Sequence, residues 1–316
     1  MIMRPRSVYP KVVALVGPTA SGKTDLALLL AKRFHGFVIS ADSRQLYKGM
    51  TIGTAKPALF RPRMLCLQRI FHIARIRHFM LDLLSPAEMY SAALYQKTVY
   101  EILACMYRRF PKQLPLIVGG TGLYIDAVTE NWVFPSVPPH IILRKKMEKQ
   151  SSEVLLQRLH KLDPDTAAHI DIHNQRRLVR ALEYVLSEKR SFLRAQRKEQ
   201  ASFQTLLLGI TVPRKILYER IDKRVDTQIQ QGLLQEVREL VDRYGWTLPL
   251  LNTIGYREFR TFFEGEASLE STITLIKRNV RRYAKRQLTW WRKKPVHWIT
   301  KPVEAINRVE KFLKEK

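Results

Sequence analysis

Short runs of apolar, often β-branched residues alternate with stretches of helical spacing along much of the chain. Four runs, each ending in a polar or glycine-rich turn, are expected to form strands over residues 11–16, 37–41, 114–118 and 206–212. Apolar residues at helical spacing follow the first run. Strands that alternate with helices predict an α/β fold with a parallel sheet, whose carboxyl edge carries the functional loops.

A long stretch between the third and fourth expected strands has helical apolar spacing throughout. We therefore expect residues 130–203 to form an all-helical insertion domain. This insertion divides the core into a first part, residues 1–129, and a second part, residues 204–316. The second part returns to helices over roughly 214–244 and 271–292.

Five of the 13 glycines lie in two short loops, one after the first expected strand and one after the third. The first loop is Gly17-Pro18-Thr19-Ala20-Ser21-Gly22-Lys23-Thr24, which fits the phosphate-binding P-loop between a strand and a helix. Its backbone N–H groups would bind phosphate oxygens, Lys23 would add a positive charge and Thr24 would reach a magnesium ion. Such loops often bind ATP or another nucleotide, so this one predicts only diphosphate or triphosphate binding. A chance glycine turn is the alternative.

An acidic residue, Asp42, follows the second expected strand. Motor ATPases usually carry an Asp-Glu pair after a second apolar strand, but this chain contains no Asp-Glu dipeptide. Asp42 is followed instead by Ser43-Arg44-Gln45-Leu46-Tyr47. Asp42 is thus the only nearby acid at a strand end, and capping a helix is its structural alternative.

The chain is strongly basic, with 55 Lys and Arg against 28 Asp and Glu and a formal charge of +27. Such a field favours a polyanionic partner, with nucleic acid ahead of an anionic membrane. Residues 277–294 hold nine basic residues and no acid, and we expect a helix that packs on the core and presents cations to phosphates. A merely solvated face is the alternative. The second basic cluster is Gln175, Arg176, Arg177, Leu178, Val179 and Arg180.

The cysteines and apolar stretches indicate the compartment. Cys66 and Cys105 form no C-x-x-C pair and no disulfide framework, so a reducing cytoplasm is expected. The longest wholly apolar stretch, residues 26–31, is far below the roughly 18 residues needed to cross a bilayer. We therefore expect no membrane partner.

Taken together, these segments resemble the tRNA dimethylallyltransferases. The resemblance spans about residues 11–298, and the run Asp-Ser-x-Gln-x-Tyr followed by Ile-Gly-Thr-Ala-Lys-Pro is its most specific part. The matching segments are Gly17–Thr24, Ile39–Met50, Ile52–Pro57, Val118–Tyr124, Gln175–Glu183, Arg220–Arg224, Ile254–Arg257 and Ala284–Trp290.

The resemblance implies a P-loop NTPase-like fold and the transfer of a dimethylallyl group from dimethylallyl diphosphate to N6 of adenosine 37 in the tRNA anticodon loop. The P-loop would hold the donor diphosphate rather than ATP, with Mg²⁺ at Thr24 as cofactor. Asp42 would act as the base, while Lys23, Thr24 and Arg224 stabilise the leaving diphosphate. The implied contacts to the anticodon stem-loop are Asp42, Ser43, Arg44, Gln45, Thr121, Arg144 and the cluster from Gln175 to Arg180.

Two other functions fit part of the sequence. A small-molecule or nucleoside P-loop kinase would explain residues 17–24 and a helical lid, but neither the charge of +27 nor the segment after Asp42. An RNA-binding module with a degenerate P-loop is disfavoured by the intact Lys23-Thr24 pair.

Two departures from the family pattern are visible. The segment of residues 58–76 is longer and more basic than the corresponding segment of most relatives. Its sequence indicates no role for this insertion. No Cys/His zinc finger is present near the carboxyl end, which favours a bacterial-type, cytoplasmic enzyme. We expect it to be a monomer.

Overall fold

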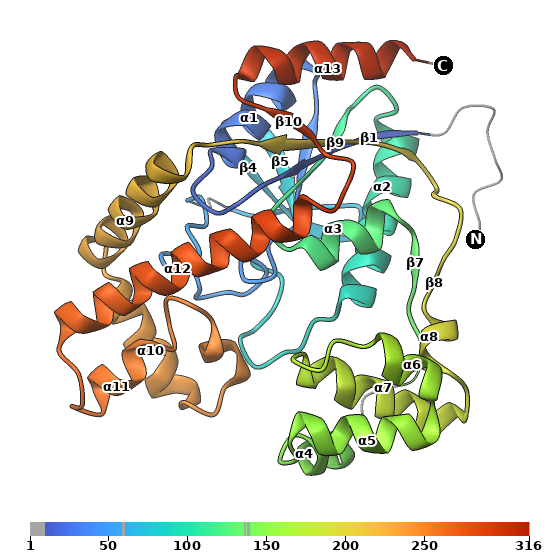
Figure 1. Cartoon of the computed structure of the whole chain (residues 1–316). Coiled ribbons are helices and arrows are strands. Elements are labelled where there is room, and N and C mark those ends of the chain that lie inside the picture. Colours follow the sequence, from blue (N-terminus) through green and yellow to red (C-terminus); the bar gives the residue numbers. More distant parts are fainter. Residues whose placement is uncertain (1–9, 59–60, 136, 138–139, 316) are drawn as a thin grey trace. The chain divides into compact units, whose positions relative to one another are not determined.

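The computed structural model divides the chain into two compact units (Figure 1). The first consists of Met1–Thr129 together with Ser202–Lys316, and the second is Glu130–Ala201. The residues that the structure describes are 10–58, 61–135, 137 and 140–315.

The first unit is built on a mostly parallel sheet with the strand order β10-β9-β1-β6-β2-β5-β4-β3. All four expected strands are present and parallel, as β1 (Lys11–Val16), β2 (Phe37–Ser40), β6 (Pro115–Val118) and β9 (Gln204–Ile210). A further parallel strand, β10 (His297–Ile299), extends the sheet beyond β9. The fold class is therefore confirmed as α/β.

Helices cover both faces of this sheet. On one face, α1 (Lys23–Arg33) and α13 (Pro302–Lys314) bury apolar residues such as Leu30 and Val309 against β1, β6 and β9. Elsewhere in this unit, α2 (Ala92–Arg109) and α3 (Gly122–Thr129) are joined by stacked Tyr95 and Tyr124 rings, 4.2 Å apart. The Tyr95 hydroxyl donates to the carbonyl of Ser40 at 3.0 Å, which fixes α2 to the end of β2.

The segment that departs from the family pattern forms an antiparallel addition to the sheet. Its strands are β3 (Arg63–Leu65), β4 (Gln68–Ile73) and β5 (Ile76–Phe79), and β5 also pairs in parallel with β2. Both connections are two-residue turns with positive φ at each residue, Cys66-Leu67 and Ala74-Arg75. Glycine and asparagine usually occupy such turns, so the sequence carried no turn signal here.

The expectation that the two cysteines form no disulfide is wrong, because Cys66 and Cys105 are bonded to each other. The bond joins the β3–β4 turn to α2 across 39 positions of sequence. Two isolated cysteines give no spacing pattern from which such a pairing can be read, because it depends on where the hairpin packs.

Helices follow β9 as expected, with one break. The stretch 214–244 forms two helices, α9 (Arg214–Gln230) and α10 (Leu233–Tyr244), separated at Gly232 with a φ of 98°. After the short elements η1 (Pro249–Asn252) and α11 (Phe259–Phe263), the long helix α12 (Leu269–Trp291) packs against α9.

The second unit contains five helices and one small strand pair within its described residues. Its apolar centre includes Leu155, Leu159, Leu178 and Leu182, all fully buried. The expectation of an all-helical insertion is wrong in one detail, since β7 (Trp132–Val133) pairs with β8 (Arg197–Lys198). The helices are α4 (Ile141–Met147), α5 (Ser152–Leu162), α6 (Pro164–His169), α7 (Gln175–Glu188) and α8 (Phe192–Ala195).

Candidate active site

The P-loop follows β1 and ends in the first turn of α1. Gly17 and Gly22 have φ values of 140° and 91°, which disfavour residues with a side chain, and Ala20 has a φ of 62°. Gly22 is the N-cap residue of α1 and has no side chain, so no side-chain cap satisfies the first backbone N–H groups of the helix. The Ser21 hydroxyl is buried and has no hydrogen-bond partner. This loop has the features of an anion-binding cradle.

Two cations are placed at this cradle. The Lys23 ammonium donates to the carbonyls of Gly17 at 3.1 Å and Pro18 at 2.6 Å. Arg224, on α9, donates to the Thr19 hydroxyl at 3.2 Å. Burial and the nearby Arg224 charge lower the pKa of Lys23 to about 8, although Asp42 acts in the opposite direction. The two neighbouring cations repel each other, and a bound anion would offset this repulsion.

Asp42 lies in the turn after β2. Its Oδ1 accepts the backbone N–H of Arg44 at 2.8 Å, which makes the local hydrogen bond of an Asx turn rather than a helix cap. The neighbouring Ser43 N–H donates to the Thr121 hydroxyl at 3.0 Å. The side chain of Gln45 contacts the following loop, where its Nε2 donates to the carbonyl of Thr54 at 3.2 Å.

The second glycine-rich loop follows β6, which lies between β1 and β2 in the sheet. A Cβ at Gly119 would clash with the backbone of Ala41, and one at Gly120 would clash with the side chain of Gln287. Buried Gln287 bridges the two loops, because its Oε1 accepts the Thr19 N–H at 2.8 Å and its Nε2 donates to the Gly120 carbonyl at 3.0 Å. These glycines therefore permit the close packing of the P-loop, the Asp42 turn and α12.

Glu236, on α10, is a residue that sequence reasoning missed. Its carboxylate accepts three consecutive backbone N–H groups, from Thr51 at 2.9 Å, Ile52 at 2.7 Å and Gly53 at 3.0 Å. The Tyr256 hydroxyl donates to the same carboxylate at 2.6 Å. A charged acceptor with four donors is a strong anchor, so Glu236 fixes the loop after residue 50 onto α10 and the turn that carries Tyr256.

Lys56 continues this chain of contacts toward Asp42. Its buried ammonium donates to the Tyr47 carbonyl at 2.6 Å and forms an ion pair with Asp82. Burial lowers the pKa of Lys56, against the opposing effect of Asp82. The loop anchored by Glu236 is thereby tied to the turn that carries Asp42.

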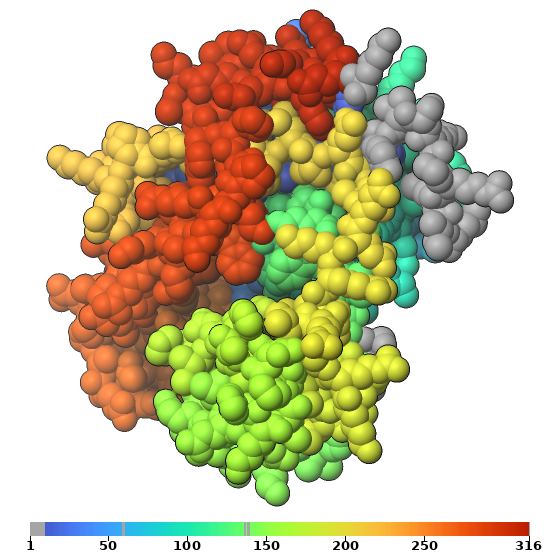
Figure 2. Space-filling model, turned by 45° about the vertical axis from the view of Figure 1, so that its right-hand side comes forward, coloured from blue at the N-terminus to red at the C-terminus, as the bar shows by residue number. Residues whose placement is uncertain are grey.

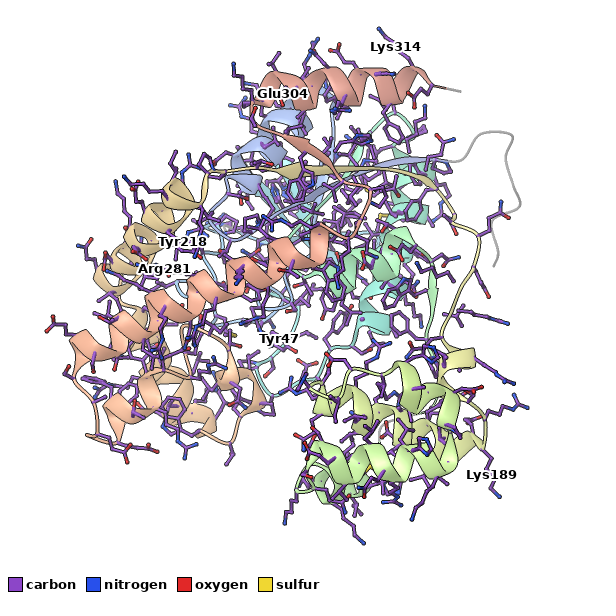
Figure 3. All side chains as sticks on the ribbon, in the orientation of Figure 1. Tyr47, Lys189, Tyr218, Arg281, Glu304 and Lys314 are labelled. Atoms are coloured by element: carbon purple, nitrogen blue, oxygen red, sulfur yellow. A yellow bond between two sulfur atoms is a disulfide. The ribbon has the colours of Figure 1, made fainter. Side chains whose placement is uncertain are left out.

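The basic helix predicted over residues 277–294 is largely α12, and not all of its cations are free to bind phosphate. Arg281 forms an ion pair with Asp222 on α9 and lies over the ring of Tyr218 (Figure 3). Lys277 pairs with Asp226 at 2.6 Å. The exposed cations within α12 are Arg278, Arg282, Lys285 and Arg286, and Arg292 and Lys293 just after the helix are also exposed. In the space-filling view, the orange and red carboxyl-terminal segments form a continuous part of the visible surface (Figure 2).

The predicted tRNA-contacting residues of the second unit fall into two groups. Arg144 and Arg180 both bind the fully buried Glu183 carboxylate, at 2.7 Å and 2.5 Å, and each keeps a partly exposed side chain. Arg176 and Arg177 are exposed, and the Gln175 amide donates to the Gln150 carbonyl at 2.7 Å. The assignment of Leu178 and Val179 as contacts is wrong for their side chains, which lie in the core of this unit.

The Glu183 carboxylate is electrostatically unusual. Burial acts to raise its pKa, but hydrogen bonds from Arg144, the His140 N–H and Arg180 outweigh burial and hold the pKa at about 2. Glu183 therefore stays ionised at neutral pH and orients the two arginines.

The described residues contain no group of three or more His, Cys, Asp or Glu side chains arranged to hold a metal ion. Thr24 lies at the first turn of α1 with an exposed side chain. A magnesium ion here would need phosphate oxygens and water for most of its ligands, which is the coordination that Mg²⁺ commonly adopts at phosphate sites.

The sequence of this chain is similar to those of known tRNA-modifying enzymes. The profile of the IPP transferase family matches residues 45–294. A tRNA dimethylallyltransferase of Thermomicrobium roseum is 40% identical over 315 residues, which cover 96% of this chain and 92% of the relative. One of Geobacillus thermodenitrificans is 39% identical over 313 residues, covering 96% and 95%.

Solved structures show the same similarity. The full-length tRNA isopentenylpyrophosphate transferase of Bacillus halodurans has a TM-score of 0.68 and 35% identity, over 96% of this chain and 95% of that one. A eukaryotic dimethylallyltransferase acting on tRNA has a TM-score of 0.74 and 26% identity, over 92% and 74%. The chain belongs to the IPP transferase family, whose relatives named here are tRNA dimethylallyltransferases.

Proposed function

We propose that this protein transfers a dimethylallyl group from dimethylallyl diphosphate to N6 of adenosine 37 in the tRNA anticodon loop and releases diphosphate. The observation that carries the proposal is the placement of Asp42 beside a P-loop with two cations, in a chain of this family. A small-molecule kinase is not favoured, since the relatives named above are tRNA prenyltransferases.

The P-loop binds the diphosphate of the donor. As the allylic carbon–oxygen bond breaks, negative charge accumulates on the leaving oxygen. Lys23 and Arg224 are the cations that stabilise this charge, together with the N–H groups of residues 17–24. Stabilising the leaving group should contribute most to the rate, because the attacking amine is a weak nucleophile.

Asp42 is the base for the attacking amine. The exocyclic N6 of adenine becomes strongly acidic as its new bond to carbon forms, so an ordinary carboxylate suffices to accept the proton. Oδ1 of Asp42 is already engaged by the Arg44 N–H, which leaves Oδ2 as the oxygen to orient and deprotonate the amine. The adenine must leave the stacked anticodon loop to reach it.

A magnesium ion at Thr24 fits the exposed hydroxyl and the chemistry of a bound diphosphate. When bound, it would neutralise part of the charge on the phosphate oxygens. Thr24 would hold it through one direct contact, while diphosphate and water supply the other ligands.

The tRNA is held by both units, each through its own residues. In the first unit, contacts come from Asp42, Ser43, Arg44, Gln45 and Thr121, around the base that is modified. In the second, Arg144, Gln175, Arg176, Arg177 and Arg180 contact the anticodon stem-loop, and Glu183 keeps two of these arginines oriented. The enzyme acts as a monomer on the cytoplasmic tRNA pool.

A direct assay tests the function. Unmodified tRNA is incubated with labelled dimethylallyl diphosphate, and the digested RNA is searched for labelled prenyladenosine. The proposal predicts label on adenosine 37 and release of one diphosphate for each transfer. Consumption of ATP with a small acceptor, and no labelled RNA, would instead identify a kinase.

A further inference from the structure

The antiparallel addition to the sheet gathers three basic side chains on one face. In the pairing of β4 with β5, His72 lies directly opposite Arg77. In the pairing of β3 with β4, Arg63 lies opposite Ile70, two positions from His72 and therefore on the same face of the sheet. Arg63, His72 and Arg77 thus form a row across three adjacent strands, which we name the hairpin face.

The row lacks acidic partners, and its two arginines carry its positive charge at neutral pH. The pKa of His72 is lowered first by burial and then by the charges of Arg63 and Arg77, in agreement with the row that the strand register defines. No ion pair involves any of the three among the described residues. Neither residues 61–81 nor residues 102–125 include an Asp or Glu. Arg63 and Arg77 share one face with no acid close in the sequence, and the positive potential that they create there favours a bound anion.

The row is also held in place. The guanidinium of Arg77 lies over the Phe110 ring at 4.5 Å and donates to the Gln113 side-chain oxygen at 3.0 Å. The Cys66–Cys105 disulfide ties the β3–β4 turn to α2. Two exposed arginines, Arg108 and Arg109, end that helix. A cation fixed by stacking loses little conformational freedom on binding, and a guanidinium fits two phosphate oxygens at once.

We propose that the hairpin face binds phosphates of the RNA backbone and, resting on the function proposed above, those of the tRNA substrate away from the modified adenosine. Guanidinium groups bind phosphate oxygens, and such contacts position the RNA without reading its sequence. The longer, basic segment at residues 58–76 then has a role, as an additional RNA-binding surface outside the active site.

Two charge-matched double variants test this proposal. Arg63→Gln with Arg77→Gln removes two positive charges from the face. Arg69→Gln with Arg75→Gln removes two from the same hairpin but off the face, because Arg69 pairs with Met64 on the opposite side and Arg75 lies in the β4–β5 turn. The dissociation constant for unmodified tRNA is measured from 50 to about 300 mM KCl for both, a range over which phosphate contacts dominate the change.

The face variant should reduce the slope of log Kd against log [KCl] by about 1 to 2, and the control by less than 1. Because Arg77 also packs on Phe110, the single variant Arg63→Gln is included, and it should lower the slope by about 1 by itself. At saturating tRNA, kcat for prenyl transfer should stay within twofold of the wild type in all variants.

Equal slopes for the two double variants, or an unchanged slope in Arg63→Gln, would overturn the proposal. The function and the surface can fail separately. If the variants show the predicted difference in slopes but the wild type transfers no prenyl group to the bound tRNA, the proposed function fails and the RNA-binding face stands.

Discussion

The side-chain oxygen of Gln287 accepts a hydrogen bond from the backbone N–H of Thr19 at 2.8 Å. This contact joins α12 to the P-loop, although the two residues are 268 positions apart in the sequence. The same side chain reaches the Gly120 carbonyl through its other atom. The basic helix α12 therefore helps to hold both glycine-rich loops in position.

Replacing Gln287 with Ala should loosen this connection. Two partly buried backbone groups lose their partners, at a cost of about 1–3 kcal/mol each before relaxation. We expect a lower midpoint of denaturant unfolding and a roughly tenfold lower kcat/KM for dimethylallyl diphosphate. Gln287→Glu is the informative comparison, since it keeps an acceptor for Thr19 but adds a negative charge beside the diphosphate site. An unchanged KM in Gln287→Glu would contradict this role.

Asp42→Asn should abolish prenyl transfer and leave the protein folded. The asparagine oxygen can still accept the Arg44 N–H and preserve the turn, but it cannot take the proton from N6. A loss of at least 100-fold in single-turnover rate is expected, within the range for removing a general base. Affinity for tRNA, measured by filter binding, should change little. Full activity of Asp42→Asn would show that another group accepts the proton.

The pH dependence of diphosphate binding should report Lys23. Because its pKa in the empty site is about 8, the ammonium loses its proton as the pH rises above this value, and an anion bound beside it would raise the pKa. Affinity should therefore fall above pH 8, with proton uptake on binding. Calorimetry in two buffers of different ionisation enthalpy measures that uptake. Lys23→Met should bind weakly with no such bend, and a wild-type affinity that stays level to pH 9.5 would contradict the assignment.

The lowered pKa of Lys23 also makes the stability of the empty protein increase with pH. The folded-state pKa of Lys23 lies below the model-compound value of 10.5, so the unfolded chain binds more protons between about pH 8 and 10.5. Lys23 therefore destabilises the empty protein at neutral pH, and this destabilisation is relieved as the pH rises through that window. The difference in unfolding free energy between Lys23→Met and the wild type should shrink over the same range.

Glu236→Gln should reduce turnover by acting on Asp42 at a distance. The amide retains one acceptor atom but repels at least one of the backbone N–H groups that the carboxylate now binds, so the loop of residues 51–53 should detach in part. We expect kcat to fall about tenfold while KM for dimethylallyl diphosphate changes little, because the P-loop is not part of this contact. Tyr256→Phe, which removes one of the four donors, should have a smaller effect. A selective rise in KM would place the role of Glu236 elsewhere.

Removing Glu183 should destabilise the second unit. Glu183→Gln leaves Arg144 and Arg180 without their charged partner, and breaking a buried ion pair typically costs about 3–5 kcal/mol. The wild-type interaction is fully present above a pH of about 4.5 and is lost as the pH falls through about 2, since the folded-state pKa is depressed. Urea unfolding at pH 7 and pH 2.5 should show a smaller difference between the two proteins at the lower pH.

Local sequence patterns were enough to predict the central strands and the P-loop. Residues 11–24 combine an apolar strand, two glycines at positive φ and a helix start, all within one short segment. The anchoring by Glu236 was not predictable, because it depends on backbone N–H groups 183 or more positions away. Nothing in an isolated glutamate distinguishes such an anchor from a solvated side chain.

The basic cluster on α7 shows why contiguous residues should not be assigned together. A helix turns 100° at each residue, so Arg176 and Arg177 face solvent while Leu178 and Val179 enter the core. The hairpin was missed for a different reason, since Cys66-Leu67 and Ala74-Arg75 adopt positive φ without the glycine or asparagine that usually marks such turns.

The most direct test of the central claim is a crystal structure with an anticodon stem-loop and an unreactive thio analogue of dimethylallyl diphosphate. The diphosphate should lie on the N–H groups of residues 17–24, contacted by Lys23 and Arg224, with N6 of a flipped adenine within hydrogen-bond distance of Asp42. A diphosphate bound outside this loop, or an adenine held beyond the reach of Asp42, would contradict the proposed mechanism.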